Sequence, residues 1–282
     1  MSLRGGWRKF VNAFVLCLTA LFAVAAVSVL FFILGYLVYH GRKNVNWNFF
    51  TKLPKPVGEP VGGMANAIVG TAKLLFVALV IGAPVGIFSG VYLSEFGGKA
   101  ASFFIRYTAD LLNGVPSIVI GIFAYAIIVL RGRHFSTLAG GFALGVIMIP
   151  IIVRSTEQFL KAVPRPLREG AMALGASKWR TVLTVVVPAA ASGIITGIML
   201  ALARIAGETA PLLFTAFSNR YWSPGFKQPI ASLPVMIYTY AIGPYRDWHE
   251  QAWTAGLVLL GLVFVLNVAT RLIFARKMAA FR

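Results

Sequence analysis

The sequence predicts an all-α membrane protein with six transmembrane helices. Of the 282 residues, 59% are hydrophobic and only 12% are charged, and the mean hydropathy is +0.81. This composition provides too little polar surface to solvate a water-soluble globule. Six apolar runs each reach the ~20 residues that a helix needs to cross a bilayer. One cysteine and no Gly-X-Y period exclude the disulfide-rich and collagen-like classes.

The first apolar run, residues 10–39, predicts a retained transmembrane helix. It is longer than the ~7 to 15 apolar residues of a cleaved signal peptide. The polar, Pro-rich stretch 41–63 that follows suits a loop outside the membrane. Residues 1–63 are therefore expected to form an N-terminal transmembrane helix and an outer loop.

Five more runs predict the remaining spans of a domain over residues 64–275, followed by a cytoplasmic tail over 276–282. The runs cover about 65–93, 103–130, 137–156, 189–217 and 252–275, and a cytoplasmic loop at about 157–188 lies between the runs 137–156 and 189–217.

Prolines interrupt four of these runs, and each proline lacks the amide that would bond the carbonyl four residues earlier. They are Pro84, Pro116, Pro150 and Pro211. Freed carbonyls in hydrocarbon need protein or water around them. We therefore expect these helices to pack on one another or to line a cavity, with structural breaks at Pro116, Pro150, Gly207 and Pro211.

Basic residues predict that both termini lie in the cytoplasm. The formal net charge is +18, and fifteen of the 26 Lys and Arg fall in segments that are cytoplasmic if the N-terminus is inside. Basic residues accumulate in loops on the cytoplasmic side, beside anionic lipid headgroups. The surplus charge is explained by membrane lipid, and no nucleic-acid partner is expected.

The sequence gives little evidence for a catalytic site. The histidines His40, His134 and His249 lie far apart, without metal-ligand spacing or a nucleophile partner. No stretch reads G-x-x-x-x-G-K-[ST], so ATP, if the protein uses it, must be bound by another chain. We expect no cofactor and no metal in this chain, and no enzymatic activity of its own.

The fifth run carries an unusual charged pair. Arg204 and Glu208 are four residues apart, hence on one helical face. A lone arginine at the bilayer centre costs ~2.5–3.5 kcal/mol, so it should face protein or water and have an anionic partner. Gly207 and Pro211 bracket Glu208 and Thr209, which predicts a bend beside the pair.

The same helix has a stripe of small residues that allows a neighbouring backbone to approach closely. Its members are Ala189, Gly193, Gly197 and Ala201.

Arg204 is the strongest candidate for a substrate-path residue, with Glu208 and Thr209 beside it. A guanidinium matches two oxygens of a tetrahedral oxyanion and stays charged at any working pH. A carboxylate could accept a hydrogen bond from an anion that retains a proton, as phosphate does near neutral pH and sulfate does not. The alternative is an inert intramembrane salt bridge. Arg154 is a second candidate, either for the departing anion or as an anchor at the end of the fourth span.

The cytoplasmic loop contains a short predicted helix. Pro166 suits its first turn and Gly175 its C-terminal stop. Two interpretations stay open: a rigid element that docks on another protein, or an amphipathic segment lying on the membrane surface.

This loop resembles the E-A-A-x-x-x-G signature of ATP-binding-cassette (ABC) importer permeases, with Gly170 in place of the usual first Ala. The signature residues Glu169, Gly170, Ala171, Leu174 and Gly175 would then form a coupling helix that docks on the ATPase. The segments 203–215, 113–121 and 149–157 are similar to permeases of ABC phosphate importers. The resemblance covers nearly the whole chain.

The resemblance implies the MetI-like fold of type I ABC importer permeases and an ATP-driven phosphate importer. The implied partners are a homologous second permease, two ATP-binding subunits and an extracytoplasmic phosphate-binding protein. Two alternatives stay open: the same fold importing sulfate or molybdate, and a stand-alone anion channel or carrier, for which the coupling loop would have no use.

Overall fold

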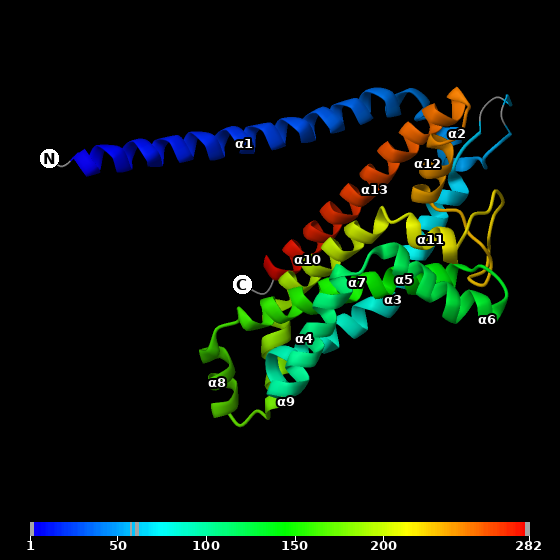
Figure 1. Cartoon of the computed structure of the whole chain (residues 1–282). Coiled ribbons are helices and arrows are strands. Elements are labelled where there is room, and N and C mark those ends of the chain that lie inside the picture. The colour runs from blue at the N-terminus through cyan, green and yellow to red at the C-terminus, as the bar shows by residue number, and fades with distance from the viewer. Residues whose placement is uncertain (1–2, 57, 60–61, 280–282) are drawn as a thin grey trace.

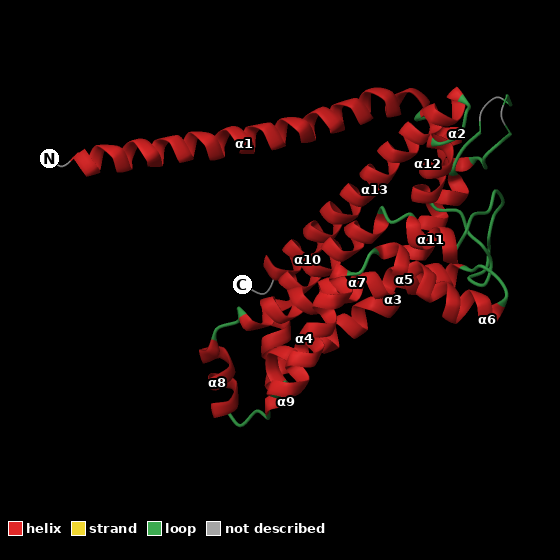
Figure 2. Ribbon diagram, viewed as in Figure 1, coloured by secondary structure: helices red, strands yellow, loops and turns green. Residues whose placement is uncertain are grey.

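The computed structural model describes residues 3–56, 58–59 and 62–279, and within these residues the chain is helical with connecting loops (Figure 2). The long helices are α1 (Leu3–Gly41), α3 (Ala65–Val91), α4 (Lys99–Gly114), α7 (Thr137–Lys161), α10 (Val187–Ala206) and α13 (Arg246–Ala279). The short α-helices are α2 (Trp47–Thr51), α5 (Ser117–Ala124), α6 (Leu130–Gly132), α8 (Arg165–Ala173), α9 (Lys178–Thr181), α11 (Ala210–Thr215) and α12 (Leu233–Ala241). A 3-10 turn, η1 (Arg42–Asn44), and three π-helical turns, η2 (Tyr92–Phe96), η3 (Tyr125–Val129) and η4 (Val182–Val186), complete them.

Helices α3 and α7 form the centre of the bundle because glycines on each receive side chains of the other. A Cβ at Gly82 would lie 2.5 Å from Met148 Cγ, and one at Gly86 would lie 2.6 Å from Ile152 Cβ. Gly90 faces Thr156 in the same way. The contacts recur every four residues on both helices, which is the spacing of ridges that pack into grooves.

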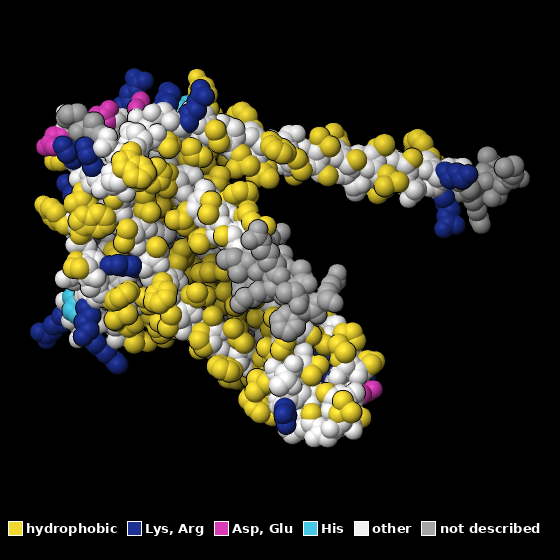
Figure 3. Space-filling view, turned by 180° about the vertical axis from the view of Figure 1, so that it is seen from behind, with side chains coloured by type: hydrophobic (Ala, Val, Ile, Leu, Met, Phe, Trp, Pro, Cys, Tyr) yellow, Lys and Arg dark blue, Asp and Glu magenta, His cyan; other side chains and the backbone are white. Residues whose placement is uncertain are grey.

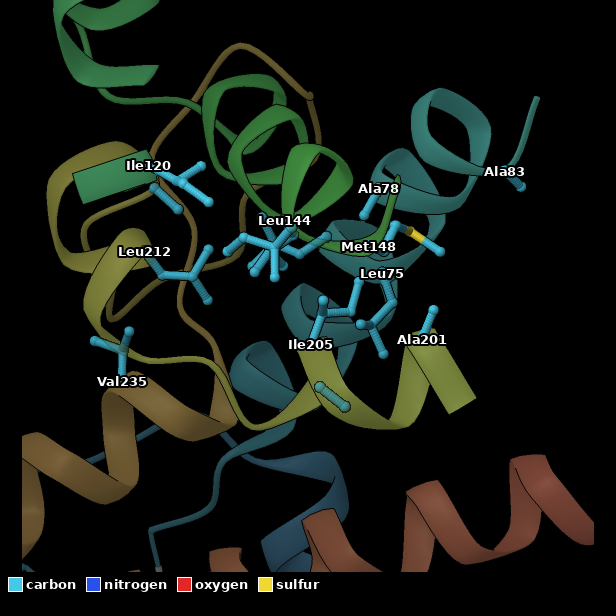
Figure 4. Packing of buried hydrophobic residues seen from close by; sticks show 14 of the residues in the cluster. Leu75, Ala78, Ala83, Ile120, Leu144, Met148, Ala201, Ile205, Leu212 and Val235 are labelled. Carbon is cyan, nitrogen blue, oxygen red and sulfur yellow. The ribbon is translucent and has the colours of Figure 1, made fainter. Parts of the chain in front are cut away.

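Helix α10 also packs on α7, through the predicted stripe of small residues. Gly193 accommodates the ring of Phe159, and Gly197 accommodates Ser155, so the two helices run antiparallel. Figure 4 shows Leu144 and Met148 of α7 in one cluster with Leu75 and Ala78 of α3 and with Ala201 and Ile205 of α10. The expectation that this stripe permits close approach is confirmed.

The third predicted span is not one straight helix. Helices α4 and α5 meet at an angle of 103°. Val115 is extended, with φ −73° and ψ 128°, because a residue before proline is driven out of the α conformation, and Pro116 then caps α5. In the part of the chain that the structure describes, five helices are long and apolar enough to cross a membrane, or six segments if the bent pair is one span.

Pro150 does not produce the predicted break. It lies inside the continuous helix α7, as Pro84 lies inside α3. Pro150 is buried, and both α3 and α10 pack on α7, so the neighbours hold the helix together where one backbone hydrogen bond is lost.

The fifth predicted span ends earlier than expected. Its helix stops at Ala206, the chain turns over residues 207–209, and α11 begins at Ala210 with Pro211 in its first turn. The breaks predicted at Gly207 and Pro211 are therefore present. Helix α12, from the apolar segment between the last two spans, is packed against α13 and α3 rather than lying on the surface.

Helix α1 leaves the bundle and runs apart from the other helices for most of its length (Figure 1). Apolar side chains cover its shaft, and basic side chains gather toward its N-terminal end (Figure 3). It is attached near its other end, where Tyr36 packs edge-on against Trp253 of α13 and the Thr254 hydroxyl donates to the Gly41 carbonyl. The exposed apolar shaft is consistent with a membrane environment.

The C-terminal helix α13 continues through Ala279, so the predicted tail boundary at residue 276 falls within this helix. Residues 280–282 of the predicted tail lie outside the described residues.

Candidate substrate path and coupling loop

Arg204 and Glu208 lie together at the break between α10 and α11. An Arg204 nitrogen is 3.6 Å from a Glu208 carboxylate oxygen, and the Arg204 side chain is 59% exposed while that of Glu208 is 13% exposed. The predicted ion pair is confirmed, and the guanidinium is not sealed between helices. Among the described residues this contact is the one ion pair of Arg204, and it leaves most of the five N–H donors available to a ligand.

The backbone explains why the pair sits at an accessible position. Helix α10 stops at Gly207, and Thr209 precedes Pro211 in the first turn of α11. The predicted path residues Arg204, Glu208 and Thr209 therefore flank a helix end rather than the middle of a span. Thr209 contributes its backbone carbonyl to the first turn of α11 through bonds from Leu212 and Leu213.

Arg154, the other predicted path residue, belongs to a different cluster. Its Nε donates to Asp110 of α4 at 3.1 Å, its Nη2 makes a second contact with the same carboxylate, and its Nη1 lies 3.5 Å from Glu157. Gly197 of α10 faces Ser155, the neighbour of Arg154, and Arg204 is seven residues farther along α10, which places it about 10 Å farther along the bundle. The structure thus separates Arg154 from the Arg204 pair.

Glu157 is the centre of this second cluster. Its carboxylate is 5% exposed and contacts Arg106 at 2.7 Å and Lys161 at 2.6 Å, in addition to Arg154. Glu157 and Arg106 were not among the site residues predicted from the sequence. Its position could have been recognised from spacing, because Glu157 lies three residues after Arg154 and four residues before Lys161 on one helix.

A cavity of about 580 Å³ opens beside this cluster, between α4 and α7. Arg106, Asp110 and Arg154 line it together with Lys99, Ser102 and Tyr107. Its wall therefore presents cations, one carboxylate and hydroxyl groups, a set able to hold a hydrated anion.

The predicted coupling loop contains the expected short helix, α8. Pro166 lies in its first turn, and Gly175 ends it with φ +86°. The Gly175 N–H bonds the Met172 carbonyl and the Ala176 N–H bonds the Ala171 carbonyl, which is the Schellman arrangement. The start and stop predicted for this helix are confirmed, and glycine is required at 175 because its φ is positive.

One face of α8 projects away from the bundle. The Leu174 side chain is 91% exposed, and Glu169, Gly170 and Met172 are also exposed, whereas Ala171 is half-buried. A protruding rigid helix with exposed apolar side chains is suited to contact another protein.

Residues 82–278 match the family described as the binding-protein-dependent transport system inner membrane component. The chain belongs to this family. It is therefore a multi-pass inner-membrane component of a transport system, not an enzyme.

Curated members of this family are similar over nearly the whole chain. The phosphate transport system permease protein PstA of Yersinia pestis is 44% identical over 96% of this chain and 92% of its own length. The PstA of Haemophilus influenzae is 42% identical over 98% of both chains.

Solved structures of ABC transporters share the fold of this family member. A chain of the inward-facing MetNI methionine transporter is 21% identical, with a TM-score of 0.55 over 77% of this chain and 93% of that one. A chain of a bacterial transporter that imports alginate is 13% identical, with a TM-score of 0.59 over 91% and 95%. These likenesses establish the MetI-like permease fold expected from the sequence.

Proposed function

We propose that this chain forms half of the pore of an ATP-driven importer of inorganic phosphate. The observation that carries the proposal is the 44% identity, over nearly the whole chain, to a phosphate transport system permease. The Arg204–Glu208 pair at a helix break provides an anion site compatible with that role.

Arg204 would hold the anion during passage. Its guanidinium is more than half exposed and has a single ion contact of 3.6 Å, so a tetrahedral oxyanion can compete for its donors. Glu208 and Thr209 would border the same point. Glu208 would limit the residence of the anion on Arg204 and could accept the proton that phosphate retains.

Arg154 would serve at a second position along the path. It lines the cavity between α4 and α7, and its contact with the exposed Asp110 carboxylate can be exchanged for a contact with a passing anion. Two cationic sites offset by about 10 Å along the bundle would allow an anion to leave one before it is held by the next.

The loop around α8 would receive the movement of the ATPase. Glu169, Gly170, Ala171, Leu174 and Gly175 form or end the protruding helix, which would dock on one of two ATP-binding subunits. A homologous second permease would complete the pore, and an extracytoplasmic phosphate-binding protein would deliver the substrate. ATP would be bound by the partner subunits, and both termini of this chain would face the cytoplasm.

Phosphate uptake by vesicles that contain the reconstituted complex tests the anion site. Arg204→Ala should lower uptake about 10- to 100-fold, the equivalent of one charge-assisted hydrogen bond of ~1.5–3 kcal/mol. Arg204→Lys should be intermediate because it keeps the charge and loses the fork.

Arg246→Ala is a matched control. Arg246 also forms an i,i+4 pair with a glutamate, Glu250, but it lies at the start of α13 and is 90% exposed. Its loss should leave uptake within about twofold of the wild type, since exposed pairs contribute little. Normal uptake in both Arg204 variants would contradict the proposed anion site.

A further inference from the structure

Arg168 of α8 joins three elements at the base of the bundle. Its Nη2 and Nε donate to the two Glu95 carboxylate oxygens, at 2.8 and 3.3 Å. It also donates to the carbonyls of Leu160 and Val163, at 2.7 and 2.5 Å. Glu95 belongs to η2, which continues α3; Leu160 is in the last turn of α7, and Val163 lies two residues after the end of α7. One side chain thus connects α8 to both central helices.

The burial and chemistry of this contact distinguish it from a surface ion pair. The side chains of Arg168 and Glu95 are 18% and 7% exposed. The planar guanidinium can serve a carboxylate and two carbonyls at once, which a lysine ammonium cannot do with the same geometry. The carbonyls at the end of a helix also favour a cation because they carry the negative end of its dipole.

A second contact holds the other flank of the loop to the same turn. Trp179 of α9 packs on Phe96 of η2 with ring centroids 5.5 Å apart, and the Lys178 ammonium lies 5.1 Å from the Phe96 ring centroid. Glu95 and Phe96 are neighbours, so α8, through Arg168, and α9, through Trp179 and Lys178, are both attached to η2. The exposed side of α8 is left to face outward.

We propose that Arg168 is a positioning residue that transmits the movement of α8 to the α3–α7 pair. The inference rests on the proposed function, in which α8 docks on an ATPase. When α8 is displaced, the four hydrogen bonds of Arg168 make η2 and the end of α7 follow it. Without them, α8 can move while α3 and α7 stay in place, so ATP would be hydrolysed without transport.

Reconstituted complexes that carry Arg168→Gln or Glu95→Gln test this transmission. The measured quantity is the phosphate imported per ATP hydrolysed, alongside the amount of ATPase subunit that co-purifies. We expect the ratio to fall about tenfold, within the range of ordinary coupling between sites, with normal co-purification. The double variant should resemble either single variant because both remove one link. Arg168→Lys should be intermediate.

Arg180→Gln is the matched control for lost charge in the same loop. Arg180 is exposed and makes no ion pair with any described residue. The phosphate imported per ATP hydrolysed by the Arg180→Gln complex should therefore equal that of the wild type. A ratio within twofold of wild type in Arg168→Gln would overturn the proposal. So would a loss of co-purifying ATPase from that variant, which would assign Arg168 to docking or folding.

A distance measurement tests the link without any phosphate. Nitroxide labels at Tyr92→Cys and Arg165→Cys, in a chain whose single native cysteine is replaced by Cys17→Ser, report the separation of η2 and α8 in the full complex. With Arg168 intact, the distribution of distances between the two labels should stay narrow, both without nucleotide and in the complex trapped with MgATP and vanadate. In Arg168→Gln the distance distribution should broaden on trapping, and an unchanged distribution would overturn the proposal.

The proposed function has its own test. Absence of phosphate uptake by the wild-type complex would contradict the proposed function alone.

Discussion

The Arg204–Glu208 pair and the cluster around Glu157 differ in how completely protein groups pair their charges. At the α10–α11 break, Arg204 is mostly exposed and has one ion contact of 3.6 Å. Between α4 and α7, Glu157 is 5% exposed and is contacted by three cations. A buried charge whose partners are all protein groups stabilises a structure but has little capacity left for a ligand. A loosely paired, exposed charge can bind one.

Of the substitutions that test this difference between the exposed pair and the buried cluster, Glu157→Gln is expected to cause the largest loss of stability. Glu157→Gln keeps the shape of the side chain and leaves three cations facing a neutral amide. Breaking a buried ion network in this way costs about 3–5 kcal/mol. Thermal unfolding of the purified chain in detergent should show a clear drop in Tm. An unchanged Tm would mean that the network does not stabilise the fold.

Asp110→Asn should have a smaller effect, although it removes a partner of the same arginine. The Asp110 side chain is 58% exposed, and Arg154 keeps its contact with Glu157. Water can replace an exposed partner at little cost. The expected drop in Tm is well below that of Glu157→Gln in the same assay. Equal drops would remove the distinction between the exposed and buried parts of the cluster.

Glu208→Gln should change stability least and affect selectivity instead. The amide no longer repels an unprotonated anion, so the preference for phosphate over sulfate should narrow by about three- to tenfold, equivalent to one hydrogen bond of ~0.5–1.5 kcal/mol. Substrate-stimulated ATP hydrolysis with each anion measures the ratio. Unchanged discrimination would assign selectivity to another component of the complex.

Local spacing in the sequence predicted part of this architecture. The apolar runs, the pairing of Arg204 with Glu208 and the glycine stop at 175 all depend on residues close together in the chain. Proline predicted a break at 116, but the angle of 103° also depends on where α5 packs, with Gly121 against Pro211.

The ion pairs between helices could not be predicted from local spacing. Arg106 and Glu157 are 51 residues apart, and Arg168 and Glu95 are 73 apart. Their partnership follows from the parallel packing of α3 with α7 and from the return of α4 beside them, which no short-range pattern encodes. Pro150 illustrates the same point, because tertiary packing overrides its local tendency to end a helix.

The glycine-lined contact between α3 and α7 has a mechanical consequence. Met148, Ile152 and Thr156 each fill the space above a glycine, so sliding one helix along the other by a single residue would drive side chains into backbone. The two helices must tilt together as one stiff lever. Since α3 alone is 27 residues, about 40 Å long, a small rotation at its inner end becomes a displacement of several ångströms at the other.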